Sequence, residues 1–260
     1  MPRLSANIGI LFREYDFLDR FAAAARAGFV AVECWAPYEY SIADLRTRID
    51  DAGIPLIGIN TAMGDAAKGE MGLAGVPGRE AEFDAIITQA LEYGAALAVD
   101  HVHVMAGAID GFTEAEGLTT FRRNLGRAAA RAEAAGVGLV IEPVNRRDRP
   151  TYLLGSSERA AEIVGVIASP SLKMMFDFYH LQIMEGDVIT RFEKHLPRIG
   201  HIQIASVPTR GEPDEGELDY AWILSEIDRL GWSGYVGCEY HPRARTEDGL
   251  VWREKFGLSP

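Results

Sequence analysis

Four apolar, strand-like runs in the second half of the chain each end on a side chain that can offer an oxygen atom to a metal ion. In order, GLVIEP, LKMMFDF, HIQIA and YVGCEY supply Glu142, Asp177, Gln203 and Glu239. A buried carboxylate is costly unless a partner or a cation compensates its charge. Three carboxylates and one amide oxygen suit Mg²⁺ or Mn²⁺, whereas zinc sites more often use His or Cys. The sequence therefore predicts a hard-cation site; the alternative is a structural network with nearby histidines and arginines.

His180 follows Asp177 by three residues in the motif Asp-Phe-Tyr-His. This spacing carries the chain just past the strand end, so we expect His180 to face whatever the cation holds. His201 precedes Gln203 by two residues and should share its face one layer deeper, because side chains alternate along a strand. The pattern leaves open whether His101 and His103 lie in the core or at the site.

Apolar runs and helical patterns alternate along the whole chain. The predicted strands are Leu4–Phe12, Ala31–Trp35, Pro55–Thr61, His101–Ala106, Gly138–Val144, Leu172–Tyr179, Gly200–Ala205 and Gly234–Tyr240. Helix signals include Ser41 with Asp44, the capping box Thr113 to Glu116, and stripes such as Leu18, Phe21, Ala22 and Ala25 or Trp222, Ile223, Ile227 and Leu230.

Eight strands alternating with helices indicate parallel pairing through right-handed crossovers. The count of eight and the late position of the site residues in strands five to eight favour a closed (β/α)8 barrel, the TIM barrel, over an open sheet. No Gly-x-Gly-x-x-Gly follows the first strand, which argues against a dinucleotide site. We expect residues 1–260 to form one catalytic barrel domain.

One connection is unusually long. Residues 60–78, NTAMGDAAKGEMGLAGVPG, are rich in Gly and Ala and lack a helical period. Long structureless loops in compact domains are usually functional, and this one leaves the C-terminal end of a strand. We therefore expect a lid over the barrel mouth; the alternative is a mobile surface insertion.

Composition narrows the partners. The chain has 260 residues, 48% hydrophobic, with 26 basic and 38 acidic residues and a formal charge of −12. Such a surface repels nucleic acid. No apolar run approaches the roughly 20 residues of a membrane span. Cys34 and Cys238 are expected to be reduced thiols of a cytoplasmic protein.

The motifs together resemble the hydroxypyruvate isomerase family, a branch of the xylose-isomerase-like barrels. The likeness covers nearly the whole chain, from SANIGILFREYDFLDRFAAAARAGF through GVPGREAEF, LVIEPVN, FDFYHLQIMEGD and GHIQIASVPTRGEPDEGELDY to GYVGCEY. Sugar epimerases of the same superfamily more often carry His where this chain has Gln203. That departure favours the hydroxypyruvate isomerase branch.

The resemblance implies roles for individual residues. Glu142 and Glu239 match the catalytic acid–base pair, and together with Asp177 and Gln203 they match the residues around the metal. His180 and Arg210 match residues that face the substrate. The implied reaction interconverts hydroxypyruvate and 2-hydroxy-3-oxopropanoate (tartronate semialdehyde) by proton transfer between adjacent carbons, assisted by Mg²⁺ or Mn²⁺.

This chemistry is consistent with the residues themselves. A cation stabilises the enediolate charge that forms as the proton leaves carbon, two carboxylates can remove and return that proton, and a guanidinium binds a substrate carboxylate through two hydrogen bonds. The partner is then a small 2-oxo or hydroxy acid, with homo-oligomerisation left open. The alternatives are an isomerase of a four-carbon 2-oxo acid, a ketose 3-epimerase or sugar-acid dehydratase, a metal-dependent endonuclease, and a non-catalytic binding protein.

Overall fold

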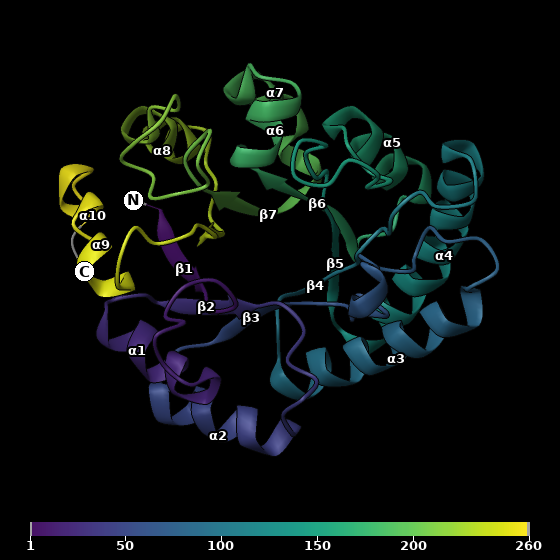
Figure 1. The fold of residues 1–260 in the computed structure, drawn as a ribbon, viewed down its shortest axis with the longest axis horizontal. Coiled ribbons are helices and arrows are strands. Elements are labelled where there is room, and N and C mark those ends of the chain that lie inside the picture. The colour runs from purple at the N-terminus through teal and green to yellow at the C-terminus, as the bar shows by residue number, and fades with distance from the viewer. Residues whose placement is uncertain (1, 259–260) are drawn as a thin grey trace.

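The protein is a closed eight-stranded parallel barrel, which confirms the predicted fold class. A computed structural model describes residues 2–258, in which each strand pairs in parallel with its neighbours and β8 pairs with β1 (Figure 1). The strands are β1 (Arg3–Asn7), β2 (Ala31–Cys34), β3 (Leu56–Asn60), β4 (His101–His103), β5 (Gly138–Ile141), β6 (Leu172–Asp177), β7 (Ile199–Ile204) and β8 (Tyr235–Cys238).

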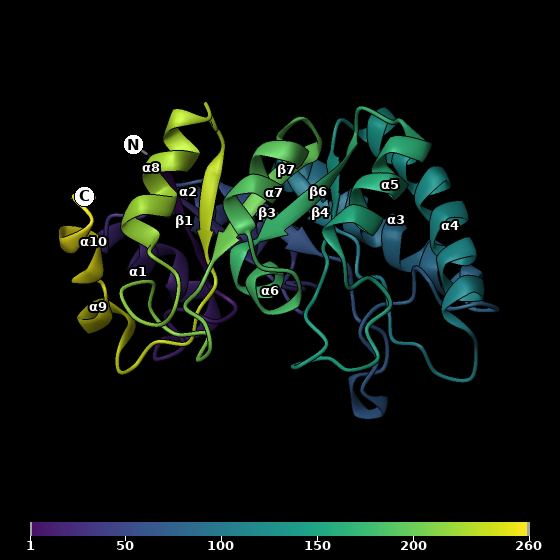
Figure 2. The ribbon, with the colours of Figure 1, turned by 90° about the horizontal axis from the view of Figure 1, so that it is seen from above.

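Helices follow the strands along the chain and surround the barrel (Figures 1 and 2). The α-helices are α1 (Arg20–Arg26), α2 (Ile42–Ala52), α3 (Glu80–Leu97), α4 (Glu114–Ala135), α5 (Ser157–Ile167), α6 (Phe178–Met184), α7 (Val188–His195), α8 (Tyr220–Arg229), α9 (Thr246–Gly249) and α10 (Trp252–Lys255). The 3-10 helices are η1 (Phe17–Asp19), η2 (Ala66–Lys68) and η3 (Leu196–Arg198). Among residues 2–258, no helix combines the length and apolar character that crossing a membrane requires.

The predicted helix signals are confirmed at two N-termini. The Thr113 side chain accepts a hydrogen bond from the Glu116 backbone, and the Glu116 side chain accepts one from the Thr113 backbone, so the capping box that opens α4 is complete. Ser41 caps α2 by accepting a hydrogen bond from the Asp44 backbone. Each of these interactions lies within four consecutive residues, which is why the sequence predicts them well.

The predicted apolar stripe of α8 is wrong at one position. Trp222 is 53% exposed, whereas Tyr220, Ile223, Leu224 and Ile227 are buried. The buried residues recur at spacings of three and four, which defines one face of the helix. Trp222 lies beside that face and meets solvent.

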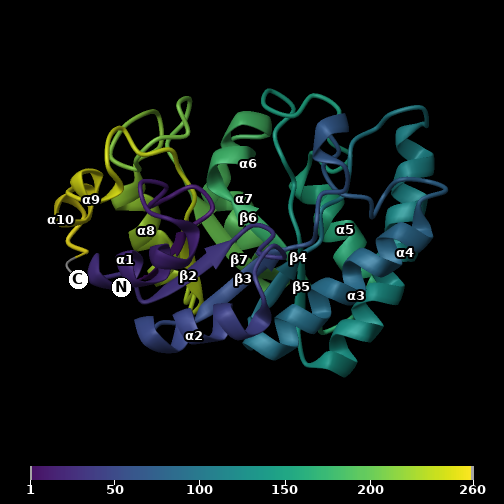
Figure 3. The same cartoon turned by 60° about the horizontal axis from the view of Figure 1, so that its bottom comes forward.

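Side chains along β7 point alternately into the apolar core and into the interior of the barrel. Ile202 and Ile204 belong to the apolar core, while His201 and Gln203 alternate with them and contact Glu33. Side chains of the second kind point into the barrel. The late strand positions that point inward therefore meet near one end of the barrel, where the loops after the strands gather (Figure 3).

The long connection between β3 and α3 lies at the same end of the barrel (Figure 3). Its second half is anchored, because Leu73 and Ala74 are buried and Asn124 donates a hydrogen bond to the Ala74 carbonyl. Residues 62–65 and 67–71 are partly or fully exposed. The lid role of this connection stays a prediction. If part of the connection moves, we expect it to be these exposed residues and not the anchored second half.

Candidate active site

A cavity of about 380 Å³ opens at the C-terminal ends of the strands. Four of the predicted site residues line its wall, namely Glu142, His180, Arg210 and Glu239. The connection after β3 contributes Met63 and Met71 to the same wall.

Strand register explains why residues far apart in sequence meet here. Asp177 on β6 is level with Gln203 on β7, and Gln203 is level with Gly237 on β8. Glu239 is two residues beyond Gly237, so alternation places it on the same inward face one layer closer to the mouth. Glu142 directly follows β5, beside β6. The sequence-predicted residues therefore come together at one end of the barrel; their roles stay predictions.

Glu239 is held by three donors. Its Oε1 accepts hydrogen bonds from Asn7 Nδ2 and Trp35 Nε1, both at 2.8 Å, and its Oε2 accepts one from Arg210 Nη2 at 2.6 Å. The Glu239 carboxylate is 8% exposed. A carboxylate with donors on both oxygens keeps a fixed orientation, which suits a group that must approach one atom of a ligand.

Glu142 and Asp177 have the opposite environment. The Asp177 side chain is 1% exposed, and its Oδ1 accepts the Tyr179 backbone N–H at 2.8 Å. Burial raises the pKa of Glu142 well above its ordinary value, and the charges of Asp177 and Glu239 raise it further. Burial likewise raises the pKa of Asp177 to about 7, against the opposing effect of Arg210. Ligand atoms of Glu142 and Asp177 lie within 4.8 Å of each other. Ionising both buried carboxyl groups without a cation is therefore energetically unfavourable.

Three buried oxygens on the predicted ligands have no hydrogen-bond partner within the described part of the chain. They are Glu142 Oε1, Asp177 Oδ2 and Gln203 Oε1. Unpartnered buried polar atoms are rare in folded proteins and often mark the place of an ion or a water molecule. Oxygen donors of this kind suit Mg²⁺ or Mn²⁺, so the residues fit the cation that the sequence predicts.

The contacts of His180 favour a hydrogen-bond donor at Nε2, although this ring lies close enough to Glu142 and Asp177 to form a buried cluster with them. Its Nδ1 lies 3.4 Å from the Asn145 backbone nitrogen, which can only donate, and 2.7 Å from Asn145 Nδ2. Burial, and then the charge of Arg210, lowers its pKa well below the ordinary value, so the ring is neutral. The proton of the neutral ring therefore resides on Nε2, which is 3.6 Å from Asp177 Oδ2 and 3.8 Å from Glu142 Oε1.

Arg210 sits on the loop between β7 and α8, with φ of 55°, in the left-handed region. Its guanidinium pairs with Glu239 and lies over the Tyr179 ring, 5.1 Å from the centroid. Arg210 Nε has no hydrogen-bond partner among residues 2–258. Although burial opposes it, the charge of Glu239 raises the pKa of Arg210, followed by that of Asp177. The guanidinium thus remains charged and keeps donors for an anionic ligand.

The structure settles the two histidines of β4. His103 lines the cavity, and its Nε2 is 3.7 Å from Glu142 Oε2. Burial, and then the charge of His201, lowers the pKa of His103 to about 3, so this ring is neutral. His101 lies deeper, where its ring centroid is 4.5 Å from that of His201 and the two ring planes are tilted by 33°.

Sequence reasoning missed several residues of the site. Asn7 ends β1 and Trp35 follows β2, whereas His103, which the sequence left open, ends β4. The end-of-strand criterion that found Glu142 and Glu239 also applies to Trp35, but it could not find Asn7, because the predicted first strand ran on to Phe12. Asn145 offered no such signal, because it acts only through His180.

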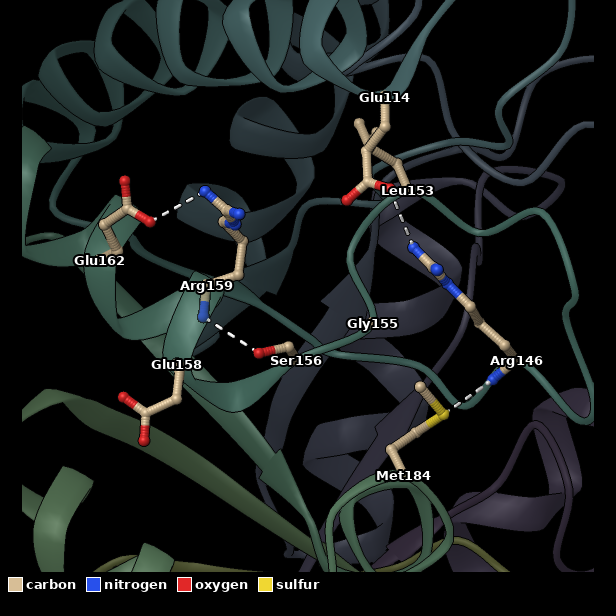
Figure 4. Close-up of a pocket in the computed structure, with 9 residues that line it drawn as sticks. All are labelled: Glu114, Arg146, Leu153, Gly155, Ser156, Glu158, Arg159, Glu162 and Met184. Atoms are coloured by element: carbon tan, nitrogen blue, oxygen red, sulfur yellow. Dashed lines mark hydrogen bonds and ion pairs between the residues drawn. The ribbon is translucent and has the colours of Figure 1, made fainter.

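A second pocket lies beside the start of α5 and shares no lining residue with the cavity described above (Figure 4). Arg146 pairs there with Glu114 at 3.4 Å, and Arg159 pairs with Glu162 at 3.0 Å. Each of its two arginines therefore already has an acidic partner.

Known proteins resemble the chain over nearly its whole length. A family model described as "Xylose isomerase-like TIM barrel" matches residues 21–256. The 2-oxo-tetronate isomerase of Cupriavidus necator is 47% identical over 257 residues, which cover 98% of this chain and 99% of that protein. The hydroxypyruvate isomerase of Escherichia coli is 37% identical and covers 98% of this chain and 100% of that protein. A crystal structure described as an AP endonuclease, family 2, from Brucella melitensis matches with a TM-score of 0.95 and 38% identity, covering 98% and 99% of the two chains.

Proposed function

The chain belongs to the xylose isomerase-like TIM barrel family and is an isomerase of small 2-oxo acids, and we propose that Glu142 and Glu239 transfer the proton. In the proposed reaction, a proton moves between carbons 2 and 3 of a 2-oxo-3-hydroxy acid through an enediolate. The observation that carries the proposal is the contrast, at the same end of the barrel, between three unpartnered buried oxygens and a carboxylate held by three donors.

The unpartnered oxygens of Glu142, Asp177 and Gln203 are the proposed cation ligands, with Glu239 completing the predicted set. A divalent cation, Mg²⁺ or Mn²⁺, would supply positive charge that stabilises the negative charge of the enediolate. The burial and the neighbouring carboxylates that raise the pKa of Glu142 also make its carboxylate a stronger base once it is ionised.

The remaining residues bind and orient the substrate. His180 Nε2–H faces the carboxylates of Asp177 and Glu142, where it can donate a hydrogen bond to a substrate oxygen. The unpartnered Nε of Arg210 can bind the substrate carboxylate while Nη2 keeps Glu239 in place. Proton removal by one glutamate and proton return by the other then complete the exchange between adjacent carbons.

Two substrates fit this chemistry. Hydroxypyruvate, the substrate predicted from the sequence, and 2-oxo-tetronate share a carboxylate, a 2-oxo group and a 3-hydroxyl group; the second adds a hydroxymethyl group on carbon 3. The relative named 2-oxo-tetronate isomerase is 47% identical, against 37% for the one named hydroxypyruvate isomerase. This difference favours the four-carbon acid as a second candidate.

The test is an isomerisation assay with both acids and a panel of longer ketoses. The protein is first treated with a chelator and then assayed with and without added Mg²⁺ or Mn²⁺. We expect turnover of one or both short acids, lost after chelation and restored by the cation. Preferential epimerisation of a longer ketose would reject the proposed substrate class, and full turnover after chelation would reject the cation.

A further inference from the structure

The orientation of the Gln203 side-chain amide matters, because its oxygen and its NH₂ group face different partners. A glutamine amide presents an acceptor oxygen on one side and a donor NH₂ group on the other, and the two have almost the same shape. The side chain is buried, with a residue exposure of 3%. Only the orientation with Oε1 toward Glu142 and Asp177 can serve a cation.

Glu33 determines that orientation. Glu33 Oε2 accepts a hydrogen bond from Gln203 Nε2 at 3.3 Å and lies 2.8 Å from His201 Nε2. A carboxylate only accepts hydrogen bonds, so it requires the NH₂ end of the amide on its side. Gln203 Oε1 is thereby turned away from Glu33, and it is one of the three unpartnered oxygens of the site.

The contact crosses the interior of the barrel. Glu33 is on β2 and Gln203 is on β7, and β1 and β8 lie between these strands in the sheet. Gly237 on β8 leaves the necessary room. A Cβ at that position would lie 2.1 Å from Glu33 Oε1, 2.9 Å from Gln203 Cγ and 2.9 Å from His201 Nε2. The absence of a side chain at Gly237 therefore lets the glutamate reach the amide.

We propose that Glu33 is a positioning residue that fixes the Gln203 amide with its oxygen toward the cation. The inference rests on the proposed cation site. It adds two residues that contact the proposed ligand and not the cation: Glu33 orients Gln203, and His201 holds Glu33. Residues that orient metal ligands typically change metal affinity about 10–100-fold when they are replaced.

The test is a double-mutant cycle on metal affinity, measured with Mn²⁺ by electron paramagnetic resonance on chelator-treated protein. The cycle compares the parent, Glu33→Gln, Gln203→Ala and the double variant. The amide introduced by Glu33→Gln can pair with either end of the Gln203 amide, so we expect this variant to weaken Mn²⁺ binding about 10–100-fold. With Ala at position 203 there is no amide to orient, so the same change should alter the affinity less than about twofold.

A charge effect gives a different pattern. If Glu33 attracts the cation only through its charge, or only supports the fold, Glu33→Gln weakens binding by the same factor in both backgrounds, and the proposal is overturned. Glu33→Asp keeps the charge but shortens the side chain, and it replaces Glu33→Gln in the cycle if that variant does not fold. If Glu33→Asp weakens Mn²⁺ binding with Gln at position 203 but not with Ala there, the proposal is supported. Unchanged Mn²⁺ affinity in Glu33→Asp overturns it.

Two further measurements complete the design. Cys34→Ala alters the next residue of β2, which points to the opposite side of the strand, and should leave the Mn²⁺ affinity unchanged. A loss of affinity in Cys34→Ala as large as in Glu33→Gln would overturn the assignment to Glu33. A parent protein that binds no Mn²⁺ would reject the proposed cation site itself, whereas a parent that binds Mn²⁺ with an unaffected Glu33→Gln variant rejects the role of Glu33 alone.

Discussion

Replacing Asp177 with Asn should stabilise the metal-free protein at high pH although it removes a proposed cation ligand. Burial raises the pKa of Asp177 from 3.8 to about 7. A raised carboxyl pKa means that the folded protein binds the proton more tightly than the unfolded chain does. The contribution of Asp177 to the free energy of unfolding is therefore fully present below about pH 4 and is lost as the pH rises through about 7.

The size of the effect follows from the two pKa values. Each pKa unit corresponds to about 1.4 kcal/mol, so ionising Asp177 in the folded protein costs up to about 4 kcal/mol at pH 8. Asn keeps an oxygen for the Tyr179 backbone N–H but carries no charge. At about 2–4 °C per kcal/mol for a protein of this size, the melting temperature at pH 8 should rise by roughly 10 °C, with little change at pH 4.

The assay is thermal unfolding with a chelator present, over buffers from pH 4 to pH 8. Asp214→Asn is the matched control, because the Asp214 side chain is 2% exposed but pairs with Arg243 and Lys255. Burial alone would raise the pKa of Asp214, but the hydrogen bond and charge of Lys255 and the charge of Arg243 outweigh it and lower the pKa. Its stabilisation is thus present above the ordinary pKa and lost as the pH falls through the folded value, so Asp214→Asn should destabilise the protein throughout this range.

Added Mn²⁺ should reverse the order of the parent and Asp177→Asn at pH 8. A cation that binds only the folded state stabilises it by mass action, and the parent binds it more tightly. The reasoning is refuted if Asp177→Asn destabilises the chelated protein at pH 8, or if its effect does not change between pH 4 and pH 8.

Three further outcomes are expected in turnover assays. Glu142→Gln and Glu239→Gln should each lose about 10²–10⁴-fold in rate, and saturating Mn²⁺ should restore part of the rate only in Asp177→Asn; near-complete rescue of either glutamine variant would show that the residue serves only as a ligand and does not transfer the proton. Deleting residues 64–70 should lower kcat at least about tenfold with unchanged melting temperature, because the exposed part of the lid can then no longer exclude water, and unchanged turnover would contradict the lid. Asn145→Ala should lower kcat about tenfold by removing the 2.7 Å side-chain contact that orients the His180 ring, although the backbone N–H that faces Nδ1 remains, as measured over a pH series beside melting curves; an unchanged rate would show that the side-chain contact is dispensable.

The order of elements and the second-half site residues are readable from the sequence because they depend on short-range patterns. An apolar run that ends on Glu142 or Asp177 shows both the strand and the direction in which its last side chain points. The capping box of Thr113 and Glu116 likewise involves four consecutive residues. Eight such units then leave few ways to bury their apolar faces, and the closed barrel is one of them.

Only the tertiary structure decides which distant groups share an environment. Asn7 and Glu239 are 232 residues apart, and Glu33 and Gln203 are 170 apart. Their contacts depend on the closure and register of the barrel, which no local pattern encodes. The same closure leaves Glu142 Oε1 and Gln203 Oε1 without hydrogen-bond partners among residues 2–258, while Glu239 has three donors. Chemically similar end-of-strand residues thereby acquire different electrostatic environments, because burial and neighbouring charge are properties of the assembled barrel.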